Sequence, residues 1–236
     1  MHKFRKLTMS LSVLCTLSFV LFAMAFSIER VAYDNNFYDG QMRELGVEEV
    51  LGVNGNDLHR IIDHTVAYIK GEKDDFQLQA TIHGQTINVY QPNEIEHMKD
   101  VQNLFALCGQ VKWVCLTLTA ICLVIICALG GWQAIRLWGK TTLWTLLAIG
   151  ILLGIVVMWV LLDFHSFWTI FHKLSFRNEL WMMRATDRMI QMFPAEFFAT
   201  VVMRICMILS SFVGGLLIAA IAAVAFIGRK RGRSFG

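Results

Sequence analysis

The stretch DFHSFWTIFHKLSFRNELWMMRATDRMIQMFPAEFF, residues 163–198, lies between two apolar runs that are each long enough to cross a bilayer. It is neither a third apolar run nor an ordinary polar loop, because nine of its residues are aromatic and several others are charged. Side chains with an apolar body and a polar tip favour the boundary between membrane and water. We therefore predict that residues 164–198 form an interfacial or re-entrant amphipathic segment.

The rest of the chain has the composition of a membrane protein. It has 236 residues, of which 56% are hydrophobic and only two are proline, and its mean hydropathy is +0.54. A helix needs about 20 apolar residues to span a bilayer, and four runs reach that length: 7–28, 113–132, 141–162 and 205–227. We predict an all-α membrane protein, a four-helix transmembrane bundle with a small extracellular cap of amphipathic helices and a short β-hairpin.

The basic residues orient these predicted spans. They precede the first run, lie in the connection between the second and third runs, and follow the fourth run, and these three places hold no acidic residue. Basic loops stay in the cytoplasm. We therefore expect a multi-pass protein of the cell membrane with both termini cytoplasmic and an active site facing the extracellular side. The basic residues are Lys3, Arg5, Lys6, Arg136, Lys140, Arg229, Lys230, Arg231 and Arg233.

The predicted segments follow from this topology. Residues 1–28 resemble a signal peptide, but their apolar part is long enough to span, so we expect a retained first transmembrane helix. No nucleic-acid-binding pattern is evident. In order, the segments are helix 1 at 1–28, the extracellular cap at 29–107, helix 2 at 108–135, helix 3 at 141–163, the interfacial segment at 164–198, helix 4 at 199–228 and a basic cytoplasmic tail at 229–236.

Within the cap, local patterns predict three elements. Apolar residues at helical spacing predict an amphipathic helix over 56–71. Alternation on either side of His83 and Gly84 predicts a hairpin within 77–91. Pro92 begins a helix that we expect to run on into the second span.

The histidines are the first candidates for chemistry. The predicted topology places His97, His165 and His172 near the outer membrane surface, and the seven-residue spacing of the last two puts them on one helical face. Asp100 shares a face with His97 and could orient its ring. The other four histidines, His2, His59, His64 and His83, are predicted to be solvated surface residues.

Other chemistries have weaker support. Glu94-x-x-His97 matches one element of a di-iron bundle, but no second copy exists, so we expect no metal. A serine or cysteine nucleophile in a membrane hydrolase or acyltransferase remains an alternative, with Ser166, Ser175 and Cys108 as candidates. A second alternative is a non-enzymatic transporter subunit or accessory protein. The cysteines form no Cys-x-x-Cys pair, which favours packing residues over disulfides.

Two blocks carry a resemblance to a known family. The block EIEHMKDV, residues 94–101, and the block FHKLSFRNELWMMRATDRMIQMFPAEFF, residues 171–198, resemble the lipoprotein intramolecular transacylases of Gram-positive bacteria. The first contains an H-M-x-D-V pattern, and the second contains F-H-x-x-x-F-x-N-x-x-W and T-D-R-x-I-x-x-F-P-x-x-F-F. The order of spans and the outer cap also agree. One departure is Met183-Arg184-Ala185, where the family has a sequence closer to Leu-Asp-Pro.

The resemblance implies a reaction and a site. The sn-2 acyl chain of a diacylglyceryl lipoprotein would move to the α-amine of its own N-terminal cysteine and give the lyso form, without a cofactor. The implied partners are the lipoprotein substrate and membrane lipid, and we expect a monomer. An α-amine is mostly protonated at neutral pH, so a base is needed, and histidine titrates in the right range. The implied catalytic residues are His97 and His172, with Asp100, Glu94, Asn178, Arg177, Trp181, Asp187, Arg188 and His165 in supporting or orienting roles.

Overall fold

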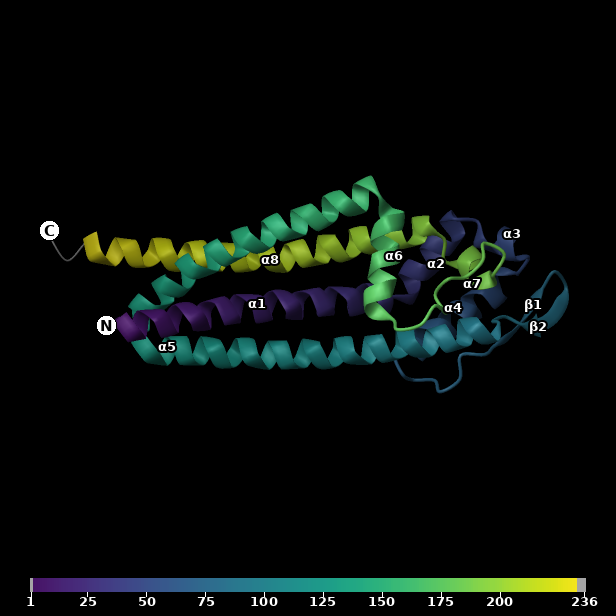
Figure 1. Ribbon diagram of the computed structural model, residues 1–236, viewed down its shortest axis with the longest axis horizontal. Helices are drawn as coiled ribbons and strands as arrows, with labels where there is room; N and C mark the ends of the chain where they lie inside the picture. Colours follow the sequence, from purple (N-terminus) through teal and green to yellow (C-terminus); the bar gives the residue numbers. More distant parts are fainter. Residues whose placement is uncertain (1, 233–236) are drawn as a thin grey trace. The chain divides into compact units, whose positions relative to one another are not determined.

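The structure, a computed structural model, describes residues 2–232, with side chains over residues 3–225. The chain divides into two compact units (Figure 1). One unit, called the bundle, contains the residues up to Phe26, Gln110–Phe167 and the residues from Met207 on. The other unit, called the cap, contains Ser27–Gly109 and Trp168–Cys206.

The bundle is built from three long helices, α1 (His2–Ala32), α5 (Pro92–Leu162) and α8 (Ala195–Gly232). Each is long and apolar enough to cross a membrane. Many of their large apolar side chains face outward, for example Trp144 and Leu162, which are 73% and 79% exposed. Such a surface is costly in water and suits a lipid environment. These observations establish a mostly helical membrane protein.

Helix α5 is interrupted by two consecutive glycines. Gly130 and Gly131 have non-helical backbone angles, and the φ of Gly131 is +51°, in the left-handed region that favours glycine. A Cβ at Gly130 would lie 2.3 Å from Cζ of Phe4. Figure 1 shows α5 doubling back at its far end from Pro92. The sequence predicts the connection at residues 136–140, but these residues are helical. The expectation was wrong because it followed the basic residues, whereas the backbone turns where glycine permits it.

Short polar side chains bond inside the bundle. The Thr16 and Thr142 hydroxyls lie 3.0 Å apart and join α1 to the part of α5 that follows Gly131. The Sγ of Cys15 lies 3.9 Å from the carbonyl of Thr119, in the part of α5 that precedes Gly130. Ser12 and Thr119 donate to carbonyls four residues earlier in their own helices. Small residues that satisfy their own polar groups allow helices to approach closely in a membrane.

The cap contains the short elements α2 (Asn35–Glu44), α3 (Val47–Leu51), α4 (Gly55–Ile69), β1 (Gln79–Ile82), β2 (Gln85–Asn88) and α7 (Arg188–Met192). The predicted helix over 56–71 is confirmed as α4, although its N-cap is Asn54, whose side chain accepts from the N–H of Asp57 at 2.9 Å. The predicted hairpin is confirmed as β1 and β2, antiparallel, with His83 and Gly84 at positive φ in the turn.

Aromatic rings fill the interior of the cap. The Phe76 ring stacks on Tyr90 at a centroid distance of 4.1 Å and lies 4.9 Å from Tyr68. The Tyr90 hydroxyl reaches Thr65 on α4 at 2.9 Å, so its buried polar atom is satisfied. These contacts join α4 to the residues just before α5.

The conformation of Gly131 generates a testable prediction. Replacing Gly131 by Ala places a Cβ at positive φ and should destabilise the protein by about 1–2 kcal/mol. The measurement is thermal unfolding of the purified protein in detergent. The matched control is Gly150→Ala, because Gly150 lies within a helix with nothing within 4 Å of an added Cβ. Equal unfolding temperatures for the two variants would contradict the assigned backbone turn.

Candidate functional site

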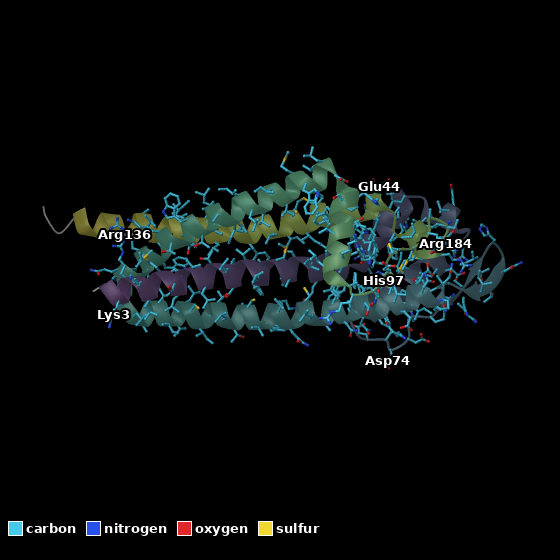
Figure 2. The ribbon with its side chains drawn as sticks, in the orientation of Figure 1. Lys3, Glu44, Asp74, His97, Arg136 and Arg184 are labelled. Carbon is cyan, nitrogen blue, oxygen red and sulfur yellow. The ribbon has the colours of Figure 1, made fainter. Side chains whose placement is uncertain are left out.

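Two buried histidines face each other in the cap. His97 lies in the second turn of α5 and is 8% exposed, and His172 lies near the end of α6 (Phe164–Ser175) and is 6% exposed. Their ring centroids are 6.1 Å apart, with planes inclined by 30°. Figure 2 labels His97 on α5. The two residues are 75 positions apart in sequence, so the fold, and not local structure, brings the rings together.

Aromatic side chains surround the pair. Phe176 lies 5.0 Å from the His97 ring and 5.6 Å from the His172 ring. Trp168 and Trp181 lie 4.6 Å and 5.0 Å from His172. Phe171 is 5.2 Å away. These rings keep water from the imidazoles, and in a region of low dielectric any polar interaction with a substrate is strengthened.

The ring of His172 has a fixed orientation. Its Nδ1 lies 2.8 Å from the backbone carbonyl of Trp168, one turn earlier in α6. A carbonyl oxygen only accepts hydrogen bonds, so Nδ1 must carry a proton and donate it. In the neutral ring the lone pair is therefore on Nε2, the nitrogen at the far edge. This arrangement presents a proton acceptor in a defined direction.

The ring of His97 is less completely bonded. Its Nδ1 is buried and has no hydrogen-bond partner within the described part of the chain. A substrate can therefore reach this ring only at its other edge, through Nε2. The pKa of His97 is lowered to about 4, chiefly by burial and also by the nearby His172, while the carboxylate of Asp100 acts in the opposite direction.

The pKa of His172 is also lowered. Burial is the main cause, and the hydrogen bond to the Trp168 carbonyl works against it. Both imidazoles are therefore neutral at pH 7. A neutral imidazole can accept a proton at one nitrogen while donating from the other, which is the property that acid–base chemistry near neutral pH requires.

Asn178 connects the two histidines. Its Nδ2 donates to Oδ2 of Asp100 at 2.7 Å, and Asp100 lies one turn after His97. Its backbone carbonyl accepts from Nε1 of Trp181 at 3.0 Å, and the Trp181 ring contacts His172. Its Oδ1 accepts from the N–H of Leu180 at 3.1 Å, which holds the local turn. One side chain therefore fixes the spacing between α5 and the segment that follows α6.

Three other predicted residues build the frame of the site. Glu94 is fully buried, and its two oxygens accept from the N–H groups of Gln91 at 2.6 Å and Met189 at 2.9 Å. Asp187 is 2% exposed and accepts from the N–H of Arg184 at 2.9 Å. Arg188 donates to the carbonyls of Asn88 and Val89 at 2.9 and 3.0 Å. These contacts join the start of α5, α7 and the end of β2.

Several residues lie outside this cluster. His165 and Arg177 are exposed, so His165 does not share the burial of His172 although both lie in α6. His59 is exposed, but its ring nitrogens reach Asp39 at 2.9 Å and Asp63 at 3.3 Å. His64 is half-buried, which corrects its expected solvated position. Among the described residues no group of three or more His, Cys, Asp or Glu side chains could hold a metal ion.

Sequence reasoning missed the aromatic walls of the site. Trp168, Phe171 and Phe176 were not singled out, although they lie four residues before, one residue before and four residues after His172. Spacings of four on a helix place side chains on one face. The local pattern therefore contained a signal for Trp168. Phe176, which contacts both histidines, is the first residue after α6 ends, and its contact with His97 required the tertiary structure.

Comparison with known proteins places this geometry in a family. The sequence model described as lipoprotein intramolecular transacylase Lit matches residues 13–198. The chain belongs to the lipoprotein intramolecular transacylase family. It is therefore an acyltransferase that acts within a lipoprotein, and the resemblance noted from the two sequence blocks is confirmed. A comparison with curated proteins finds no match.

Solved structures of a transacylase have the same fold. The in meso structure of the membrane-integral lipoprotein intramolecular transacylase Lit from Bacillus cereus matches with a TM-score of 0.71 and 19% identity, over 97% of this chain and 99% of that chain. A variant of the same protein with one histidine replaced by alanine matches with a TM-score of 0.69 and 18% identity, over 96% of each chain. A variant with arginine at that position matches with a TM-score of 0.69 and 19% identity, over 97% of this chain and 95% of that chain.

The bonds of Asn178 predict a loss of activity on truncation. Asn178→Ala removes the bond to Asp100, so the spacing of the two histidines is no longer fixed. Displacements of about 1 Å can cost up to about 100-fold in rate, and we expect transacylase activity to fall by at least about tenfold. Conversion of a diacylglyceryl lipopeptide to its lyso form measures the rate. Glu179→Ala, at the exposed neighbouring position, is the control. Equal rates for both variants would show that this link does not matter.

Proposed function

We propose that this transacylase moves the sn-2 acyl chain of a diacylglyceryl lipoprotein to the α-amine of the lipoprotein's own N-terminal cysteine. The observation that carries the proposal is the pair of buried imidazole rings with centroids 6.1 Å apart, in a setting where burial lowers the pKa of both. The reaction requires the removal of one proton from the amine and the delivery of one proton to the glycerol oxygen. Two neutral histidines can perform both transfers without a metal or cofactor.

His172 is the proposed base. The Nδ1 proton is donated to the Trp168 carbonyl, so the free lone pair is on Nε2, at the opposite edge of the ring. The same nitrogen, once protonated, is in position to return the proton to the leaving oxygen. Once the ammonium has lost one proton to solvent, a single residue that serves as base and then as acid completes the transfer without further proton exchange, which agrees with the aromatic enclosure of its ring.

His97 is the proposed stabiliser of the ester oxygen. Its low pKa keeps it neutral, and with the proton on Nε2 it donates a hydrogen bond to the carbonyl oxygen as negative charge develops there. A neutral imidazole used as an electrophile in this way is an established pattern in enzymes. The buried Nδ1 without a partner supports this role, because Nε2 is then the edge that meets the substrate.

The steps balance in atoms and protons. The amine nitrogen attacks the sn-2 ester carbonyl carbon as Nε2 of His172 takes a proton from the amine, and a tetrahedral intermediate forms with its oxyanion at His97. The bond from the carbonyl carbon to the sn-2 oxygen then breaks, and His172 gives the proton to that oxygen. The products are an amide at the N-terminus and a free glycerol hydroxyl within one molecule. Water in the site would hydrolyse the ester instead, so the enclosure by aromatic rings protects the outcome.

The proposed topology has four spans, with α5 supplying two of them on either side of Gly130 and Gly131. Both termini would be cytoplasmic, and the cap with its site would face the extracellular side. Lys3 and Arg136 lie at the same end of the bundle (Figure 2), which supports a cytoplasmic location of that end. The proposed partners are a diacylglyceryl lipoprotein and membrane lipid, and the proposed active form is a monomer.

Single histidine substitutions test the proposed function. His97→Ala and His172→Ala should each lower the transfer rate by at least about 10²-fold, which is the usual value of one acid–base group. The assay follows a purified diacylglyceryl lipopeptide by tandem mass spectrometry, because transfer leaves the total mass unchanged but moves an acyl group to the N-terminus. His165→Ala, on the exposed part of α6, should keep most of the activity. Full conversion by both alanine variants at matched folding would overturn the assignment of the pair.

The lowered pKa of His172 predicts the shape of the pH profile. The substrate amine has an ordinary pKa of about 8, so kcat/KM should fall with decreasing pH below that value. Protonation of His172 removes the base, so kcat/KM should fall more steeply with decreasing pH once His172 becomes protonated. Because burial lowers the pKa of His172 below its ordinary 6.5, this steeper fall should begin only below pH 6.5. A steepening above pH 6.5 would mean that the base is a different group.

A further inference from the structure

The carboxylates around the two histidines differ in how fully they are bonded. Both oxygens of Glu94 accept backbone N–H groups, and the residue is fully buried. Asp187 is also buried, with one oxygen on the N–H of Arg184 and the other beside the side chains of Arg184 and Gln91. Glu96 is exposed and pairs with Lys99. None of these three carboxylates is available to a substrate at the histidine pair.

Asp100 is different from all of them. It is half-exposed, and only its Oδ2 is bonded, to Nδ2 of Asn178 at 2.7 Å. No hydrogen bond or ion pair to its Oδ1 occurs within residues 3–225. The bond to Asn178 holds the carboxylate in place, so the second oxygen is presented in a defined orientation and not as a mobile surface charge.

Asp100 is also placed beside the reacting groups. It lies three residues after His97, on the same face of α5, where side chains are about 5–6 Å apart at Cβ. Through Asn178 and Trp181 it is connected to the ring of His172. Asp100 therefore offers one carboxylate oxygen as a hydrogen-bond acceptor, together with a negative charge, close to His97.

The substrate of the proposed reaction brings a hydrogen-bond donor that matches this oxygen. The N-terminal amine of a lipoprotein is mostly an ammonium at neutral pH, with three N–H donors and a positive charge. The ammonium loses one proton to solvent before the reaction, and His172 takes a second as the amine attacks the ester. A carboxylate can hold the remaining N–H without competing for either of these protons. After deprotonation the amine still has N–H donors for the carboxylate while its lone pair faces the ester.

We propose that Oδ1 of Asp100 binds the α-ammonium group of the lipoprotein substrate and so selects lipids that carry a free amine next to the diacylglyceryl thioether. The proposal rests on the proposed transacylase function and adds the subsite that recognises the nucleophile. Asn178 is the positioning residue of this subsite, because it fixes the other oxygen of the same carboxylate.

The test uses ligands that bind but cannot react. The first is a diacylglyceryl lipopeptide with a free N-terminal amine and an sn-2 ether in place of the ester. The second is the same ether ligand without the amine, made from a 3-mercaptopropionyl peptide. A charge-assisted hydrogen bond typically favours the ligand that makes it by about tenfold or more. Wild-type protein in nanodiscs at pH 7 should therefore bind the amine ligand at least about tenfold more tightly.

In Asp100→Asn this preference should vanish, with the affinity for the amine-free ligand unchanged. Glu96→Gln is the matched control, since it makes the same chemical change on the same helix, and it should keep the preference. An equal weakening of both ligands in Asp100→Asn would show a merely structural role and overturn the proposal. A preference that survives in Asp100→Asn would overturn it too, because the amine is then held elsewhere, for example by the face of Trp181.

The same preparation separates this proposal from the proposed function. Wild-type protein is also given the reactive sn-2 ester substrate, and formation of the lyso form is followed by tandem mass spectrometry. Lyso formation combined with no amine preference rejects only the Asp100 subsite. Absence of lyso formation rejects the proposed function, and the subsite that rests on it is then rejected as well.

Discussion

The geometry of the site depends on the buried carboxylate of Glu94. Its two oxygens each accept a backbone N–H, one from Gln91 at the start of α5 and one from Met189 in α7, and the side chain is fully buried. The bond from Gln91 is one half of a capping box at the start of α5. The bond from Met189 ties the same carboxylate to a segment 95 residues further along the chain. A buried carboxylate with both oxygens bonded holds its partners rigidly, and loss of either bond leaves a buried polar group unsatisfied. His97 lies one turn further along α5, so the position of the site follows from this anchor.

The burial of His97 and His172 has an energetic cost that the site uses. Enclosure by Phe176, Trp168 and Trp181 removes water and disfavours the charged imidazolium, so both pKa values are lowered. The same enclosure strengthens every hydrogen bond that forms with a substrate. A solvated histidine would keep a pKa near 6.5 and would share its site with water, which competes with the amine for the ester. Burial therefore makes the two histidines weaker bases, and the same burial favours acyl transfer over hydrolysis.

Much of the cap could be predicted from local sequence. The α4 helix, the hairpin at His83 and Gly84, and the start of α5 at Pro92 all follow from signals within a few residues. The pairing of His97 with His172 was expected from a family resemblance and from topology. The two residues are 75 positions apart in sequence, and no rule of local spacing predicts that their rings lie 6.1 Å apart. The functions of Glu94 and Asn178 as links were not predictable in detail, because their partners lie 95 and 78 positions away. The turn in α5 was misplaced because charge patterns report on membrane sidedness and do not report on which backbone can bend.

The hydrogen bond from His172 to the carbonyl of Trp168 has an evolutionary consequence. In many enzymes the imidazole is oriented by an acidic side chain, and a single substitution of that acid damages the site. Here the acceptor is a peptide group of the same helix, which every residue type at position 168 provides. The orientation of the ring is therefore resistant to point mutation and insensitive to the ionisation of any neighbour. Substitutions among the surrounding aromatic residues can change the walls of the site. The orientation of the His172 ring is kept as long as this part of the chain stays helical.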